Sequence, residues 1–312
     1  MTDRPDLAGD PKLRRLDERL GLAVSRAGMS PRTLVTYARD HVSVRTPSRP
    51  DFRDGNTIDL EAVPAPADLV AWTGRFAETI GTFGATHVQL RWETPLAADA
   101  PAVPPQADAD LVAAATDLGM ELHPTTVLLL AEPVAPPAAP AEFAVVTPPS
   151  VAAGGGGRQI SADGTPVEVE RRWHGVLVLR RYATGDGPDD WRAPDPGFTA
   201  WAVDIQRELA AAGRATIWLG QRHGAPVAEA VVLHDRQGLA TIEDVIVHPA
   251  HRRLGIASSL IHRAVASHLA DHPGSRIGTG ADPGGSADRL YRRLGFRPHA
   301  TVWSAVRAPS AP

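Results

Sequence analysis

The stretch 240–257 (ATIEDVIVHPAHRRLGIA) constrains the fold of this chain more than any other. Residues 240–247 form an apolar, β-branched run typical of a buried strand, Pro249 turns the chain, and a helix begins near residue 252. The first N–H groups of such a helix lack partners, and its dipole favours negative charge there. Gly255 and Ala257 keep bulky side chains away from those groups. The stretch therefore predicts a strand, a turn and a helix with an anion site at its start.

The residues around this stretch predict a meander followed by a second strand–helix–strand unit. Strands at 216–221, 227–234 and 240–247 are separated by turns too short for parallel pairing, so we expect antiparallel neighbours. The other expected elements are strands at 36–44, 176–180, 276–280 and 301–306, an amphipathic helix that starts at Asp10 and ends before Gly28, a helix at 198–212, and a short helix that Gly295 ends.

Two motifs resemble the GNAT acyltransferase superfamily: Arg252-Arg253-Leu254-Gly255-Ile256-Ala257, similar to its acetyl-CoA pyrophosphate loop, and Leu290-Tyr291-Arg292-Arg293-Leu294-Gly295-Phe296, similar to its closing LYxxLGF motif. The resemblance covers residues 173–307. It implies an α/β fold with a mixed (α+β) sheet, the acyl-CoA N-acyltransferase fold, and acetyl-CoA as co-substrate. The residues it implies for the cofactor are the backbone of Val245 and Val247 for the pantetheine arm, and Arg252, Arg253, Leu254, Gly255, Ile256, Ala257 and Ser258 for the pyrophosphate.

Glu243 and Asp244 are adjacent acids in an otherwise apolar strand, and burying a carboxylate is costly unless it is paired. Strict alternation places them on opposite faces, although a β-bulge would change this. The resemblance makes an acid on this strand a candidate general base, with Glu243 first and Asp244 second. The alternative is a solvated or salt-bridged pair without a chemical role.

Tyr291 is the third catalytic candidate. The resemblance implies that its phenol is the general acid for the departing thiolate, while packing alone would also explain a Tyr on this stripe. One position departs from the family: many relatives carry Asn where this chain has Gly284.

The N-terminal half carries a faint internal repeat. Leu118-Gly119 and His123 recur as Leu294-Gly295 and His299, at an offset of 176 residues (294 minus 118). Chance recurrence of a helix–Gly–strand junction is one explanation. We favour a second, degenerate GNAT-like copy without the Arg-x-x-Gly-x-Ala loop, and hence a tandem protein. The expected domains are 1–147 (degenerate copy), 148–169 (linker) and 170–312 (catalytic).

The linker assignment rests on the Pro- and Gly-rich composition that begins near residue 131. Within this segment Gly154–Gly157 lacks the Lys-Ser/Thr of a phosphate loop. The run Gly278-Thr279-Gly280 lacks the third glycine of a dinucleotide fingerprint. His248 and His251 have no carboxylate at metal-ligand spacing, so we expect surface histidines and no metal.

Composition narrows the function further. The absence of cysteine rules out an acyl-Cys route, and a net charge of −4 gives no basic footprint for nucleic acid. Without a signal-like or membrane-spanning apolar run, we expect a cytoplasmic protein with no membrane partner.

The resulting hypothesis is an N-acetyltransferase that moves an acetyl group to a small-molecule or peptide amine by direct attack in a ternary complex. A non-catalytic CoA-binding, sensing or scaffold protein is the alternative. Trp191, Trp201 and Trp218 either line the acceptor surface or pack in the core, and a homodimer is compatible with the sequence.

Overall fold

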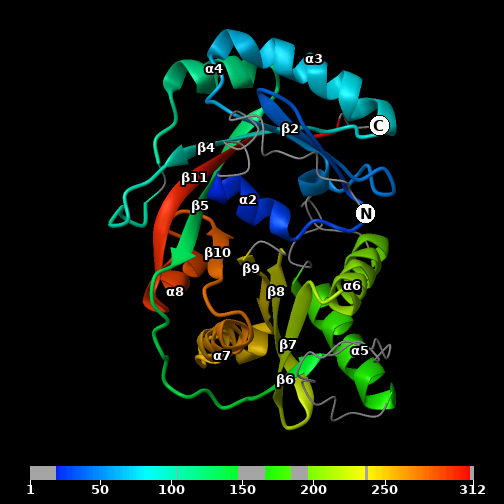
Figure 1. Ribbon diagram of the computed structural model, residues 1–312, viewed down its shortest axis with the longest axis vertical. Coiled ribbons are helices and arrows are strands. Elements are labelled where there is room, and N and C mark those ends of the chain that lie inside the picture. Colours follow the sequence, from blue (N-terminus) through cyan, green and yellow to red (C-terminus); the bar gives the residue numbers. More distant parts are fainter. Residues whose placement is uncertain (1–18, 104, 147–165, 184–195, 236–237, 310–312) are drawn as a thin grey trace. The chain divides into compact units, whose positions relative to one another are not determined.

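The computed structural model describes residues 19–103, 105–146, 166–183, 196–235 and 238–309 (Figure 1). The chain forms two compact units: unit 1 contains 1–131 and 278–312, and unit 2 contains 132–277. These units do not coincide with the sequential halves 1–147 and 170–312. The reason is strand β11 (Phe296–Arg307), which is inserted between β4 (Val88–Pro95) and β5 (Glu121–Leu130).

Unit 2 is built on an antiparallel meander of four strands in the order β9-β8-β7-β6. The strands are β6 (Glu142–Val146), β7 (Ala215–Arg222), β8 (Ala225–His234) and β9 (Leu239–Val247). His223 and Gly224 both have positive φ, 51° and 77°, as a tight hairpin turn requires. The predicted meander is confirmed. The Pro-rich segment that begins near residue 131 nevertheless contains β6, because its apolar residues 143–146 pair with the edge of β7.

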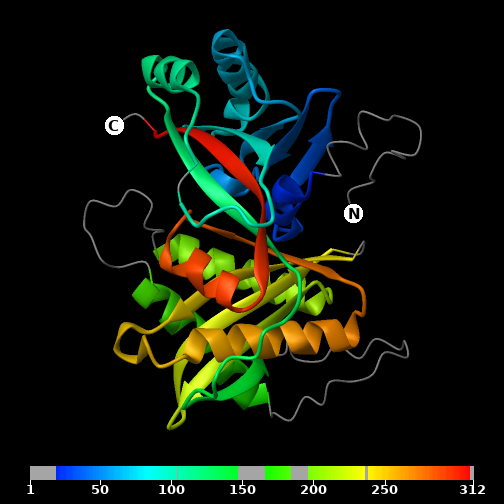
Figure 2. The same ribbon diagram turned by 90° about the vertical axis from the view of Figure 1, so that its left-hand side faces the viewer.

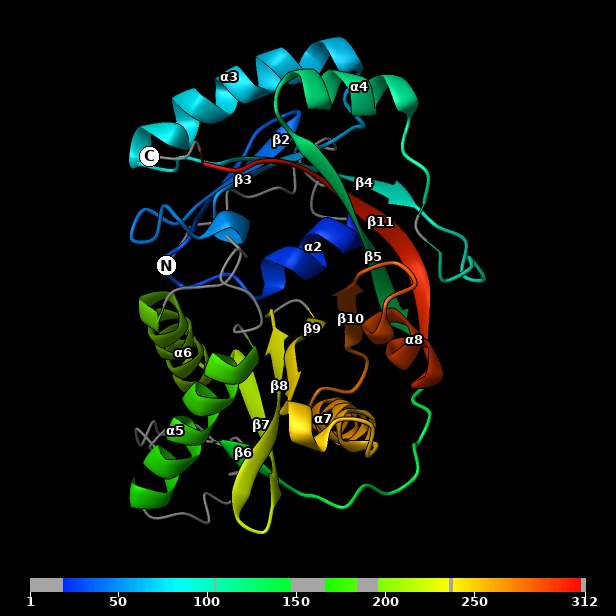
Figure 3. The ribbon, with the colours of Figure 1, turned by 180° about the vertical axis from the view of Figure 1, so that it is seen from behind.

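Helices cover both faces of this meander. Helices α5 (Pro166–Ala183) and α6 (Pro196–Ala211) lie on one face, and α7 (Ile256–Asp271) lies across the other (Figures 2 and 3). The strand predicted at 176–180 is wrong, since these residues belong to α5. Val169, Trp173 and Val176 are buried at spacings of four and three, which is a helical stripe. The apolar run 176–179 (Val-Leu-Val-Leu) resembles a strand when it is considered without its neighbours.

Unit 1 contains a seven-stranded mixed sheet in the order β1-β2-β3-β4-β11-β5-β10. Its remaining strands are β1 (Leu34–Tyr37), β2 (His41–Arg45), β3 (Thr57–Leu60) and β10 (Arg276–Ala281). β3 and β4 pair in parallel and the other neighbours are antiparallel. The single strand expected at 36–44 is instead the β1–β2 hairpin, because residues 38–40 turn the chain.

The two faces of the unit 1 sheet differ in polarity. Helices α3 (Leu69–Thr79) and α4 (Ala109–Asp117) cover the apolar face, where Phe76, Leu90, Trp92 and Trp303 form the core. Helix α2 (Leu20–Ala27) lies on the opposite face, as Figure 3 shows. The predicted amphipathic helix is thus confirmed from residue 20 onward, and its residues before 19 lie outside the described chain. Helix α8 (Ser286–Arg293) completes this unit.

Candidate active site

A β-bulge in β9 sets the geometry of the acidic pair. Ile246 faces Glu229 of β8, whereas Glu243 faces Val231, so β9 has one more residue than its partner between these pairs. Asp244 takes the extra place with φ of 51°, in the left-handed region that few non-glycine residues adopt. The bulge overturns the expected opposite faces: Glu243 shares the face of Val231 beneath α5 and α6, and the Asp244 carboxylate also bonds to these two helices.

Asp244 is held by two donors. Arg180 Nη2 of α5 lies 2.7 Å from Asp244 Oδ2, and Gln206 Nε2 of α6 donates to the same oxygen at 2.9 Å. The Asp244 side chain remains 43% exposed. Glu243 is half-buried and accepts a hydrogen bond from Thr241 Oγ1 at 2.9 Å. The two predicted acids are therefore neighbours in different environments: Asp244 binds side chains of α5 and α6, and Glu243 binds Thr241 of its own strand.

The sequence analysis did not identify Glu229, a second carboxylate that binds Arg180. Glu229 of β8 is fully buried and binds Arg180 through Nε at 3.1 Å and Nη2 at 2.8 Å. Burial raises the pKa of Glu229 to about 7, with the charge of Arg180 opposing the shift. Burial also opposes the charge on Arg180, but Asp244 and Glu229 outweigh it and raise the Arg180 pKa. The signal was present, because Glu229 is an acid in the apolar run VAEAVV (227–232), the same pattern that singled out Glu243.

The predicted pyrophosphate loop lies at the start of α7. His248 leads into a 3-10 turn (Pro249–His251), and Arg253 and Gly255 then have positive φ, 66° and 75°. Gly255 is the residue before the first turn of α7, and no described side chain caps that end of the helix. The first helical bond runs from Ser259 N–H to Gly255 O, which leaves the N–H groups of residues 255–258 without intrahelical acceptors.

The loop is open on its outer side. Residues 252–255 are exposed, and a Cβ added to Gly255 would meet no described heavy atom within 4 Å. Gly255 is thus required for its backbone angle and not for lack of space around its Cα atom. Arg252 Nε donates to Val247 O at 3.2 Å, which places one guanidinium beside the strand end. Val245 and Val247 follow the bulge as half-buried residues.

Tyr291, the third catalytic candidate, belongs to unit 1. It lies on α8, is buried to 4% exposure, and its ring meets Phe296 edge-on with centroids 5.4 Å apart. The structure also explains the missing Asn. Gly284 has φ of 69°, and a Cβ there would lie 2.7 Å from the Ala102 carbonyl oxygen. The adjacent Pro-rich loop therefore leaves no room for a side chain at position 284.

Unit 1 has a strand–helix junction of its own, from β3 to α3, that differs in chemistry from the α7 loop. Pro64 and Pro66 lack N–H groups, and the Asp68 carboxylate accepts from Ala65 N–H at 3.2 Å. This negative side chain lies where an anion would have to bind. The expected lack of a usual pyrophosphate loop in the N-terminal half agrees with this chemistry.

Two of the remaining motifs lie in the described part of the chain. Gly278 and Gly280 lie within β10, and Gly278 is small because α2 approaches, with Val24 Cγ2 only 2.5 Å from an added Cβ. The rings of His248 and His251 are tilted by 54°, with centroids 5.6 Å apart, and the described residues contain no group of three or more His, Cys, Asp or Glu arranged to hold a metal. Gly154–Gly157 and Trp191 lie outside the described residues.

Two of the tryptophans considered for the acceptor surface are described. Trp201 packs against the core beneath α6, and Trp218 is 7% exposed on β7. No described helix is both long and apolar enough to cross a membrane.

Comparison with known proteins supports this geometry. Residues 213–298 match the family model of the acetyltransferase (GNAT) domain, and no curated protein matches the chain. A functionally unknown conserved protein from Staphylococcus epidermidis is similar, with a TM-score of 0.61 at 11% identity, over 88% of this chain and 93% of that one. A GCN5-related N-acetyltransferase from Kribbella flavida has a TM-score of 0.54 at 16% identity, over 96% of both chains. The chain therefore has the GNAT fold and carries a GNAT acetyltransferase domain at residues 213–298.

Proposed function

We propose that this protein is an acetyl-CoA-dependent N-acetyltransferase whose acceptor is a small-molecule or peptide amine. The observation that carries the proposal is the uncapped N-terminus of α7, with left-handed Gly255 and exposed Arg252 and Arg253, directly after a bulged strand. Four adjacent N–H groups and two guanidinium groups match the charge of a pyrophosphate. The backbone of Val245 and Val247, which follows the bulge, is proposed to bind the pantetheine arm.

The reaction is direct attack, and the chain has no cysteine for a covalent intermediate. The amine nitrogen attacks the thioester carbonyl carbon, the C–S bond breaks, and the nitrogen loses a proton while the CoA thiolate leaves. Glu243 is proposed to take that proton directly or through water. Asp244 is the weaker candidate because its Oδ2 already accepts hydrogen bonds from Arg180 and Gln206.

Two further roles are proposed on the sequence motifs. Tyr291 is proposed to return a proton to the departing thiolate, on the strength of the LYRRLGF motif alone. The N-terminal half is proposed to be a degenerate GNAT-like copy, because its β3–α3 junction carries prolines and a carboxylate where the α7 loop carries glycine and arginine.

Free thiol release from acetyl-CoA, measured against a panel of primary amines, tests the activity. We expect amine-dependent release that falls in Glu243→Gln with CoA affinity retained. The loop is tested with Gly255→Ala and the control Gly274→Ala, because both glycines have positive φ (75° and 88°) and free space around an added Cβ. We expect the KM for acetyl-CoA to rise in the first variant only. CoA binding without thiol release to any amine would contradict the enzyme, and equal effects of the two variants would contradict the loop.

A further inference from the structure

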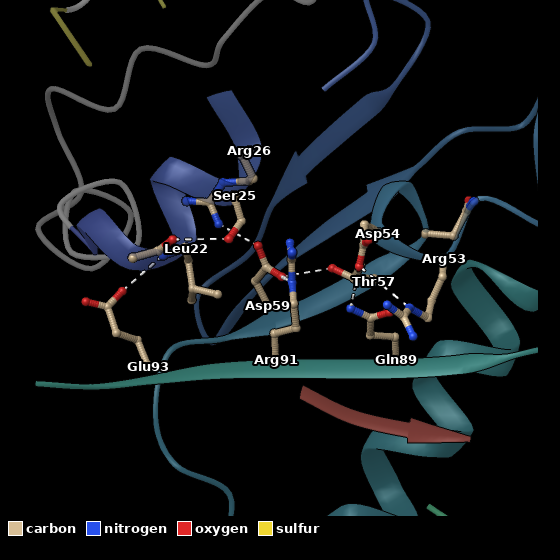
Figure 4. Close-up of polar contacts among 12 residues, drawn as sticks. Leu22, Ser25, Arg26, Arg53, Asp54, Thr57, Asp59, Gln89, Arg91 and Glu93 are labelled. Atoms are coloured by element: carbon tan, nitrogen blue, oxygen red, sulfur yellow. Dashed lines mark hydrogen bonds and ion pairs between the residues drawn. The ribbon is translucent and has the colours of Figure 1, made fainter. Parts of the chain in front are cut away.

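Unit 1 buries a row of polar side chains that the proposed acetyl transfer does not use (Figure 4). Asp59 is fully buried there and accepts hydrogen bonds from Arg26, Thr57 and Arg91. Burial raises the pKa of Asp59, but the charges of Arg91 and Arg26 outweigh it and hold that pKa below its usual range. Asp59 is thus paired within the protein, as a structural network requires.

A cleft of about 500 Å³ in unit 2 differs from this row, because several of its lining side chains are exposed. Five alanine and proline residues of the segment 135–141 line one side, and Ser259, His262 and Arg263 of α7 line another. Phe143 of β6 also lines the cleft. Sites for small molecules have volumes of about 300–1,000 Å³ and are mostly apolar, with a few polar groups. The cleft has both properties.

The segment 135–141 crosses the outer side of α7 (Figure 2). Ser259 Oγ donates to the carbonyl oxygen of Pro137 at 3.2 Å, which ties the segment to the first turns of the helix. Prolines at 136, 137 and 140 restrict the backbone of this wall. The wall therefore loses little further conformational freedom when a ligand binds.

Phe143 supplies an aromatic surface to the cleft. It lies opposite Gly220 of β7, where an added Cβ would come within 3.3 Å of Phe143 Cε1. The missing side chain at position 220 thus gives the ring its place over the sheet. The guanidinium carbon of Arg263 lies 5.7 Å from the centroid of the ring, within the range of a cation–π contact. A cation therefore stands beside the aromatic surface.

The Arg263 guanidinium is available to a ligand. Within the described residues, Arg263 and His262 form no ion pair and no side-chain hydrogen bond, and Arg263 is exposed. The ring contact leaves the five N–H donors of Arg263 unused. Glu142 also lines the cleft, but strand alternation directs its side chain to the face of Val146, which packs in the core beneath α5 and α6. The charged side chain on the α7 side of the cleft is therefore a cation.

We infer that this cleft binds a small aromatic carboxylic acid. The carboxylate accepts two parallel hydrogen bonds from the Arg263 guanidinium and a third from a ring N–H of His262. The aromatic ring packs against Phe143 and the alanine and proline wall. This site lies along the side of α7 and does not depend on acetyl transfer, whereas the pyrophosphate is proposed to bind at the N-terminus of the helix.

Saturation-transfer NMR on the full chain tests the site, with 2-naphthoate, 2-naphthamide, cyclohexanecarboxylate and phosphate as probes. We expect 2-naphthoate to bind through its ring and phosphate not to displace it. The amide keeps the ring but lacks the charge, so it should bind about tenfold more weakly. Cyclohexanecarboxylate keeps the charge but lacks the aromatic ring, so it should bind about threefold to tenfold more weakly. Displacement of 2-naphthoate by CoA would place this probe in the cofactor site and overturn the proposal.

Variants of two lining residues make the test specific. Arg263→Met keeps the length of the side chain but removes its charge, so 2-naphthoate should bind at least tenfold more weakly, and Arg263→Lys should restore only part of the loss. Phe143→Leu should reduce the preference for 2-naphthoate over cyclohexanecarboxylate. Arg276→Met is the matched control, because Arg276 is exposed in the same unit and does not line the cleft.

The control variant should bind 2-naphthoate as wild type does. If Phe143→Leu does not fold, the two Arg263 variants decide the outcome, since their side chain is exposed. Absence of 2-naphthoate binding, or undiminished affinity in Arg263→Met, would overturn the proposal.

Discussion

Replacing Arg180 by Met should destabilise unit 2 in a pH-dependent manner. The variant leaves Glu229 fully buried without the guanidinium that bonds to it at 2.8 and 3.1 Å. Removing one partner of a buried ion pair costs about 3–5 kcal/mol. Glu229 escapes part of this cost by binding a proton, and its pKa, already about 7, must rise further without Arg180.

The sign of the pH dependence follows from linkage. Glu229 has a folded-state pKa above its unfolded value of 4.5, so the folded state binds the proton more tightly and stability falls as pH rises. In wild type this fall ends near pH 7. In Arg180→Met it continues to the higher pKa, so the difference in unfolding free energy should grow by about 1.4 kcal/mol for each pH unit above 7.

Urea denaturation at pH 6, 7, 8 and 9, with hydrogen exchange of β8 peptides as the readout, measures this difference. Adding Glu229→Gln to the Arg180→Met variant should abolish the extra pH dependence, because no titratable group is left at position 229. A difference that stays constant from pH 7 to 9 would refute the reasoning about Glu229.

Three further predictions concern other parts of the chain. His268 is 6% exposed, and burial together with the charges of neighbouring histidines lowers its pKa to about 4. The unfolding free energy should therefore be full above pH 6.5 and fall by about 1–2 kcal/mol between pH 6.5 and pH 4. A His268→Leu variant should flatten the dependence of the urea midpoint on pH. Residues 170–312 expressed alone should not melt cooperatively by circular dichroism, because β11 loses its partners β4 and β5. Gly284→Asn should cost about 1–3 kcal/mol in urea denaturation, since its Cβ would meet the Ala102 carbonyl, and a wild-type midpoint would contradict this contact.

Much of the secondary structure was predictable because local patterns and tertiary packing agree. The meander and α7 are examples, since their apolar periodicity matches the faces that are buried. The prediction of a strand at 176–180 was wrong because four consecutive aliphatic residues, 176–179, also fit a buried strand. The helical spacing of the buried residues can be seen only over the longer window 169–179. The insertion of β11 between β4 and β5 was not predictable, since strand order depends on pairing across some 170 residues, which no local pattern encodes.

The part of the candidate site that is formed by backbone N–H groups was predictable. Gly255 precedes a helix that must expose unpaired N–H groups, and that follows from sequence spacing alone. The orientation of Asp244 was not predictable, because the bulge turns its carboxylate toward Arg180 and away from the face that alternation assigns. The role of Arg180 was not predicted, because residues 176–180 were assigned to a strand and not to helix α5.

The start of α7 is proposed to hold the CoA pyrophosphate. Titrating the full chain with CoA, while following backbone amide shifts by TROSY NMR, tests that claim. We predict downfield shifts of the N–H protons of Gly255, Ile256, Ala257 and Ser258, with no change at the β3–α3 junction, where Asp68 already accepts from Ala65 N–H. Unchanged amides at 255–258 under CoA saturation, or shifts at residues 64–69 instead, would contradict it.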